Sequence, residues 1–280
     1  MNAGDIAACA VNALLIEVDT WPKPGLVSRV DSGSHADMDA ALLECSARTL
    51  GPYFERLAEA GKASAEMAQL RAIGIEAEAA MLRATDGVNT HRGAIFGLGL
   101  LCAATAVSAG GADLGEIVRR RWGAQIGLPA ANDSSHGARV WRRHGILGAR
   151  AEAVRGFPHL YGIGWPALRA GRRLAQNDEV AARVHCLMAL MAQLDDTNLL
   201  HRGGAQGLLF ARALASGFMQ RGGVGRGDWR EHAQRAHQLM LARCLSPGGS
   251  ADLLAMTLFV DAVHASSERD ERRDPEWALA

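Results

Sequence analysis

Glycine, histidine, arginine and acidic residues gather in six short polar segments that lie between apolar stretches of this chain. The segments are PKPGLVSRVDSGSHADMD, TDGVNTHRG, NDSSHG, GARAEAVRGF, DDTNLLHRGG and SPGGSADLL. Glycine lets a backbone approach a ligand closely, and the N-terminus of a helix favours an anion. Several segments of this composition in one chain predict a shared polar site for phosphate groups and metal ions.

Lys23 stands between Pro22 and Pro24 in a chain that otherwise uses arginine almost everywhere. Lysine and arginine total 30, and only Lys23 and Lys62 are lysine. Two prolines stiffen the backbone and so aim the ammonium group, which is not interchangeable with a planar guanidinium. We therefore predict that Lys23 contacts a phosphate; the alternative is a turn with an exposed lysine.

Consecutive acids stand at Asp195 and Asp196, directly after the apolar run CLMALMAQL. Adjacent carboxylates repel each other unless a cation lies between them, and Mg²⁺ binds through one or two carboxylates together with substrate phosphates. The alternative is a solvated acidic turn.

His91 and Arg92 precede a long apolar stretch, where a helix N-terminus would bind a triphosphate or a ribose. An Asn-Thr cap with an exposed arginine explains the same residues equally well.

Four other polar residues also have a purely local explanation. Asp37 and Ser250 are good helix caps, and Asp39 and Asp252 are acids placed for the first turn of a helix. For Asp37 and Asp39 the local explanation alone would suffice. For Ser250 and Asp252 the local and functional interpretations are equally supported.

Several common sites are absent from the sequence. The five cysteines form no Cys-x-x-Cys pair and the histidines form no His-Glu-x-x-His motif, which argues against zinc. There is neither a P-loop nor a Gly-x-Gly-x-x-Gly after a strand. Equal numbers of basic and acidic residues, 30 of each, argue against a nucleic-acid partner and against a polybasic membrane-binding surface.

The residues that position these segments are typical of helices. Aromatic residues are only 5 % of the 280, and much of the apolar content is alanine and leucine, which favour helices over strands. We predict an all-α fold with one compact domain over residues 1–268 and a charged, frayed tail over 269–280. The expected helices cover 3–19, 37–50, a piece from 52, 64–85, 93–109, 113–124, 159–175, 178–194, 204–216, 228–244 and 250–267.

Two observations bear on location. The first residues, MNAGDIAACAVNALLIEVD, have no basic region and do not look like a signal peptide, and unpaired cysteines are typical of a reducing compartment. Residues 93–112 carry no charge, but they are weakly hydrophobic for a membrane span, so we expect a fully buried central helix instead. A cytoplasmic protein without a membrane segment is the expectation.

Taken in order, five segments resemble the triphosphoribosyl-dephospho-CoA synthases. They are PKPGLVSRVDSGSHADMD, GVNTHRGAIFGLGLL, GARAEAVRGFP, DTNLLHRGG and SPGGSADLLA, and they span residues 17 to about 260. The resemblance implies that ATP and 3′-dephospho-CoA give 2′-(5″-triphosphoribosyl)-3′-dephospho-CoA and adenine. That product is the prosthetic-group precursor of citrate lyase or malonate decarboxylase, and the stretch WPKPGLVSRVDSGSH looks more like the malonate decarboxylase branch. One departure is His91-Arg92 where many relatives have His-Lys, which keeps the charge.

The resemblance and the needs of this reaction together assign roles to the polar residues. Breaking the bond between adenine and ribose needs a carboxylate base for the attacking hydroxyl and cations for the triphosphate. The predicted base is Glu78 or Glu152, and Lys23 acts with it on phosphate. The predicted substrate-binding residues are Arg29, His35, Asn89, His91, Arg92, Arg150, His201, Arg202, Gly203 and Ser250. The predicted Mg²⁺ ligands are Asp195 and Asp196, with Asp37 and Asp252 as further ligands.

The sequence leaves two rival functions open. A Mg²⁺-dependent helical N-ribosyl hydrolase would use water in place of the acceptor hydroxyl. A non-enzymatic assembly factor would dock on a carrier subunit, and its polar loops would tolerate alanine. Among partners, the resemblance implies ATP and dephospho-CoA directly and the carrier-protein loading enzyme indirectly, and a homodimer is compatible with the sequence.

Overall fold

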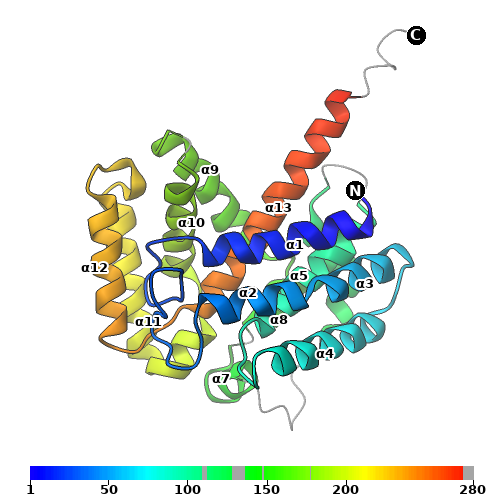
Figure 1. Cartoon of the computed structure of the whole chain (residues 1–280), viewed down its shortest axis with the longest axis horizontal. Helices are drawn as coiled ribbons and strands as arrows, with labels where there is room; N and C mark the ends of the chain where they lie inside the picture. The colour runs from blue at the N-terminus through cyan, green and yellow to red at the C-terminus, as the bar shows by residue number, and fades with distance from the viewer. Residues whose placement is uncertain (109–111, 128–135, 147, 177, 274–280) are drawn as a thin grey trace.

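The computed structural model describes residues 1–108, 112–127, 136–146, 148–176 and 178–273. Helices joined by loops and turns make up this part of the chain, which contains no strand, so the predicted all-α fold is confirmed (Figure 1). No helix in the described ranges is both long enough and apolar enough to span a membrane. Cys102 and Cys186 are buried, whereas Cys45 and Cys244 are exposed.

The first half of the chain forms five helices, of which α1, α2 and α4 begin at capping side chains. They are α1 (Ala3–Val18), α2 (Ala40–Thr49), α3 (Gly51–Lys62), α4 (Met67–Ala84) and α5 (Arg92–Thr105). The predicted cap of α2 is wrong, and α4 begins later than predicted. Asp39, not Asp37, caps α2, because its Oδ1 accepts a hydrogen bond from the Leu42 N–H at 2.9 Å. Glu66 precedes α4 in extended backbone and forms a capping box with Gln69, so the helix begins at Met67 and not at Ser64.

Helix α5 is the buried central helix that the uncharged stretch after Arg92 predicts. Leu98, Leu101 and Cys102 have no exposed surface, and the helix packs against α1, α3 and α13. Glycines allow this close approach: a Cβ on Gly61 of α3 would lie 2.2 Å from the carbonyl oxygen of Ala103 in α5. The helix ends at Thr105, earlier than predicted, and residues 109–111 lie outside the described ranges.

The second half follows the predicted order of helices, with α7 and α8 in addition and with different boundaries for several helices. Its elements are α6 (Leu114–Trp122), η1 (Gly123–Gln125), α7 (His136–His144), α8 (Ala149–Val154), the π-helical η2 (Leu160–Gly164), α9 (Trp165–Leu174), α10 (Glu179–Gln193), α11 (Thr197–Gln220), η3 (Gly223–Gly225), α12 (Trp229–Leu241) and α13 (Gly248–Arg273). Helix α11 starts at Thr197, so most of the predicted 195–204 loop is helical, with a break in helical backbone at Gly204. Helix α13 starts at Gly248, which places Ser250 inside its first turn and not at its cap.

Helix α13 connects the two groups of helices. It packs against α1 and α5 on one side and α10 on the other, and its C-terminal end projects beyond the body of the molecule (Figure 1). The helix continues to Arg273, four residues past 269, where the frayed tail was predicted to begin. Residues 274–280 of that predicted tail lie outside the described ranges.

Candidate active site

Asp196 joins the N-termini of α11 and α13. Its Oδ1 accepts hydrogen bonds from the backbone N–H groups of Asn198 at 2.9 Å and Leu199 at 3.3 Å, which makes it the N-cap of α11. Its Oδ2 accepts from the backbone N–H and the hydroxyl of Ser250 in α13, at 2.8 and 3.0 Å. Burial raises the pKa of Asp196, and these four donors oppose the rise.

Asp252 joins the N-termini of α13 and α5. A Cβ on Gly93 would lie 2.1 Å from Asp252 Oδ2, so only glycine fits under this carboxylate. The backbone N–H of Ala94, in the first turn of α5, also acts on this carboxylate and favours its charged form. Burial raises the pKa of Asp252 well above its usual range, and the negative charges of Asp196 and Glu17 add to the rise. The N-termini of α5, α11 and α13 therefore meet around two acids.

His91, the residue before α5, is buried two positions before the Gly93 that lies under Asp252, and it is held by a hydroxyl relay. Thr90 Oγ1 donates to Ser46 Oγ at 2.7 Å, and the Ser46 hydroxyl lies 2.7 Å from His91 Nδ1. The Ser46 hydroxyl therefore links the Thr90 hydroxyl to the imidazole ring of His91 and fixes the ring's position. Burial and the positive charge of Lys23 lower the pKa of His91 to about 4, so the ring is neutral at pH 7.

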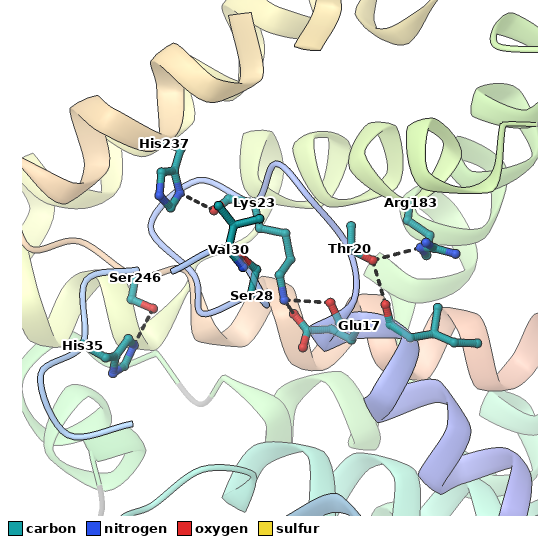
Figure 2. A network of polar contacts seen from close by, with 10 residues as sticks. Glu17, Thr20, Lys23, Ser28, Val30, His35, Arg183, His237 and Ser246 are labelled. Atoms are coloured by element: carbon teal, nitrogen blue, oxygen red, sulfur yellow. Dashed lines mark hydrogen bonds and ion pairs between the residues drawn. The ribbon is translucent and has the colours of Figure 1, made fainter. Parts of the chain in front are cut away.

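Lys23 is enclosed within the protein, and both of its ends are fixed (Figure 2). Its Nζ lies 2.7 Å from the carbonyl oxygen and 2.6 Å from Oε1 of Glu17, in the last turn of α1. Its own carbonyl oxygen lies 2.8 Å from Nδ1 of the buried His237 in α12. With 0 % exposure Lys23 presents no surface to a ligand in this structure, and the exposed-turn alternative is wrong. We call Glu17, Lys23, His91, Asp196 and Asp252 the polar cluster.

Arg92 and Glu78 form an ion pair at the edge of the polar cluster, beside Gly93. The Nε of Arg92 is buried and has no hydrogen-bond partner among the described residues. A buried N–H without an acceptor costs roughly 1–3 kcal/mol, so this N–H is available to donate to an additional anionic partner. Asn89 has a local role, because its Oδ1 accepts a hydrogen bond from the Arg92 backbone N–H at 3.2 Å.

A second group of predicted residues holds the loop between α1 and α2 against the start of α13. Arg202 of α11 donates to the carbonyl oxygens of Ser34 at 2.9 Å and Cys244 at 3.1 Å, and to His35 Nδ1 at 3.1 Å. His35 Nε2 lies 2.9 Å from the Ser246 hydroxyl (Figure 2). Burial and the charge of Arg202 lower the pKa of His35. In this structure the Arg202 guanidinium donates its hydrogen bonds to backbone carbonyl groups and to a histidine.

The consecutive acids Asp195 and Asp196 do not face a common point. Asp195 is 56 % exposed and pairs with Arg212 of α11 at 2.9 Å, whereas Asp196 is buried. Asp195 lies near His159, whose pKa is raised chiefly by its hydrogen bond to Glu152. Glu152, a predicted base, is buried and accepts from His159 Nδ1 at 2.6 Å and from its backbone N–H at 3.2 Å. Gly148, at the start of α8, packs against Thr197, the residue that follows Asp196.

The remaining predicted residues lie apart from the polar cluster or serve packing. Arg29 is exposed and pairs with Asp19 and Glu44. Asp37 is 63 % exposed and lies 3.5 Å from His35. The others are Arg150, which donates to the Gly127 carbonyl at 3.1 Å, His201, which is exposed, and Gly203, where a Cβ would lie 2.6 Å from the Leu245 side chain.

The described residues contain no group of three or more Asp, Glu, His or Cys side chains arranged to hold a metal ion. The fit of Mg²⁺ therefore depends on carboxylates that act together with substrate phosphates. Asp252 fits this role best, because its carboxylate stands beside two other acids. Both oxygens of Asp196 already accept two donors each, and Asp195 and Asp37 have other neighbours.

Sequence reasoning missed Glu17, Ser46 and His237. Glu17 stands in an apolar first helix, where an acid in the last turn is unfavourable to the helix dipole unless a cation is nearby. That position was the available signal, because Lys23 follows six residues later. No local signal identifies Ser46 or His237, because their partners His91 and Lys23 are distant in sequence.

Comparison with known proteins identifies a family that matches nearly the whole chain. The family model for ATP:dephospho-CoA triphosphoribosyl transferase matches residues 3–271. A "Probable 2-(5''-triphosphoribosyl)-3'-dephosphocoenzyme-A synthase" of Stutzerimonas stutzeri (strain A1501) is 43 % identical over 263 residues, which cover 91 % of this chain and 90 % of the relative. The chain belongs to this transferase family.

Further relatives of this transferase family member carry the same name. The protein of Azotobacter vinelandii is 43 % identical over 270 residues, with 91 % of this chain and 90 % of the relative covered. That of Pseudomonas aeruginosa (strain UCBPP-PA14) is 42 % identical over 271 residues, with 94 % and 92 % covered. No solved structure matches the chain. Membership in an enzyme family supports the transferase class over the non-enzymatic assembly factor.

Proposed function

We propose that this protein transfers the 5-triphosphoribosyl group of ATP to the 2′-hydroxyl of 3′-dephospho-CoA and releases adenine. Family membership supports the reaction, and the meeting of three helix N-termini supports its location. The observation that carries the location is the buried, unpartnered Nε of Arg92 beside Gly93 at the start of α5. An N–H donor without an acceptor, next to a helix N-terminus, suits a phosphate oxygen.

In this reaction the bond between ribose C1′ and adenine N9 breaks, and its electron pair leaves with adenine. The acceptor O2′ forms the new bond to C1′, its proton passes to a carboxylate, and adenine takes up a proton. Of the two predicted bases, Glu78 has the better position, because its partner Arg92 is adjacent to Gly93. Glu152 is buried and accepts two hydrogen bonds from His159.

We further propose Mg²⁺ as the metal, held by Asp252 and the substrate phosphates with Asp196 beside it. When bound, Mg²⁺ would neutralise charge on the triphosphate. The neutral His91 and the backbone N–H groups at the start of α5 would be uncharged donors for phosphate oxygens. The role of the product in the malonate decarboxylase branch is also part of this proposal, supported by the stretch WPKPGLVSRVDSGSH.

The test is mass spectrometry of the products from ATP and 3′-dephospho-CoA, with adenine release as the rate assay. We expect the triphosphoribosyl adduct and adenine in equal amounts. Adenine release at the same rate without an acceptor would establish the hydrolase instead. Glu78→Gln should lower kcat by about 10²–10⁴-fold, as for loss of a general base. Glu152→Gln is the comparison, and a larger loss there would reassign the base.

A matched test compares the acceptors CoA and dephospho-CoA at equal concentration. CoA carries a phosphate on the oxygen next to the attacking hydroxyl, and the carboxyl groups of Glu17 and Asp196 act electrostatically on Asp252 in the polar cluster. Like charges repel strongly where screening by water is weak. Discrimination of about 10³-fold against CoA corresponds to roughly 4 kcal/mol. Comparable rates with both acceptors would contradict an attacking hydroxyl beside these acids.

A further inference from the structure

Lys23 lies where it cannot meet a substrate without leaving its partners. It is fully buried, and its Nζ donates to the carbonyl oxygen and to Oε1 of Glu17 at 2.7 and 2.6 Å. The carbonyl is one of the last in α1, which have no partner within the helix. A cation at a helix C-terminus is favourable, so the ammonium serves both the helix end and the carboxylate.

The backbone around Lys23 is held as firmly as its side chain. His237 Nδ1 lies 2.8 Å from the Lys23 carbonyl oxygen, and the Leu26 N–H donates to the same oxygen at 3.2 Å. Two residues later the backbone passes so close to α12 and its following loop that a Cβ on Gly25 would lie 2.1 Å from the Leu245 carbonyl oxygen. Figure 2 shows the side chain extended between His237 at one end and Glu17 at the other.

Lys23 is also the cation of the polar cluster. Glu17, Asp196 and Asp252 contribute three carboxyl groups, and His91 is neutral at pH 7. Asp196 is balanced by four hydrogen-bond donors, whereas Glu17 depends on Lys23. Glu17 in turn interacts electrostatically with Asp252, and α1 packs along α13, which carries Asp252. Removal of the ammonium would leave Glu17 uncompensated next to Asp252.

We propose that Lys23 is a positioning residue that acts through Glu17 to hold the acids of the polar cluster in place, and that it touches no substrate phosphate. This inference rests on the proposed function for its kinetic test only. It replaces the phosphate contact predicted from the sequence with a role inside the protein. Glu17 becomes a functional position of equal weight, because the two side chains work as one unit.

The test is a double-mutant cycle with Glu17→Gln, Lys23→Met and the combined variant. Breaking one partner of a buried ion pair is strongly destabilising, whereas replacing both with neutral groups of similar volume is often tolerated. We therefore expect the double variant to be folded by circular dichroism and more heat-stable than Lys23→Met alone. Its kcat should fall at least tenfold while KM for ATP stays within threefold, and the single effects on kcat should not add.

Three results would overturn the inference. A rise in KM for ATP in Lys23→Met, with Glu17→Gln silent, would show a phosphate ligand. Additive losses in kcat would show two independent residues, and a folded double variant with wild-type kcat would show a purely structural pair. Lys62→Met, at the exposed other lysine of the chain, is the control and should match the wild type in every measurement.

A measurement without substrate separates this inference from the proposed function. If Lys23 balances the acids, Asp252→Asn should restore part of the thermal stability that Lys23→Met loses. Equal losses with and without Asp252→Asn would overturn the positioning role even if the enzyme makes the expected product. If instead the wild type forms no adduct from ATP and dephospho-CoA, the proposed function fails, and the stability coupling still decides the role of Lys23.

Discussion

Gly93→Ala would put a methyl group where the Asp252 carboxylate lies. The new Cβ would be 2.1 Å from Oδ2 and 3.0 Å from Cγ of Asp252, whereas ordinary contacts between heavy atoms are about 3.5 Å. The carboxylate must therefore move by about 1.4 Å or turn away from α5. Misplacement of about 1 Å near reacting groups costs roughly 10²-fold, so we expect kcat/KM to fall by about that factor.

The effect of Gly93→Ala on stability should be small by comparison. Alanine in place of glycine favours a helix by up to about 1 kcal/mol. Displacement of the buried Asp252 carboxyl group leaves it poorly paired, which costs about 1–3 kcal/mol. With the gain of about 1 kcal/mol from alanine, the free energy of unfolding should fall by about 0–2 kcal/mol. Activity is then lost from a protein that remains folded.

Adenine release from ATP and dephospho-CoA measures the activity, and urea unfolding measures the stability. Gly74→Ala in α4 is the matched control, because a Cβ there would have no neighbour within 4 Å. We expect it to gain up to about 1 kcal/mol of stability with unchanged kcat/KM. Wild-type activity in Gly93→Ala would refute the reasoning, because the position of Asp252 over α5 would then be irrelevant to catalysis.

The remaining predictions concern the acids and the metal. Asp196→Asn should lower the free energy of unfolding, measured by thermal unfolding, by about 1–3 kcal/mol, because the new amide would face the buried Ser250 N–H. Asp195→Asn should lower it by less than about 1 kcal/mol, because the ion pair of Asp195 with Arg212 lies at the surface. Burial raises the pKa of Asp252. The Asp252 carboxyl group of the unfolded chain therefore loses its proton at about pH 4, whereas that of the metal-free folded protein loses it only at higher pH. Stability should therefore fall as pH rises from about 4, and Asp252→Asn should unfold at a higher temperature at pH 7 and lack this slope; an unchanged slope would assign it to other groups. Excess EDTA should abolish adenine release and Mg²⁺ should restore it, and full activity in EDTA would exclude the proposed metal.

The sequence by itself determined the fold class and the start of a helix such as α6. Alanine and leucine content with few aromatic residues predicts helices, and Asp113 caps α6 as expected because its side chain accepts from the Glu116 N–H, three residues away. The buried nature of α5 also followed from its uncharged sequence. These features depend on neighbours within one or two turns, which a sequence displays directly. The ordered polar segments likewise predicted the family.

Only the tertiary structure decided which polar side chains meet. Asp195 and Asp196 are equivalent in sequence, yet one pairs with Arg212 at the surface and the other links α11 to α13 inside. Lys23 has the composition signal of a phosphate ligand but is enclosed with Glu17. The direction of a side chain at the end of a helix depends on how that helix packs against others, and composition carries no record of packing angles or distances. The polar cluster is therefore a product of the convergence of α1, α5, α11 and α13.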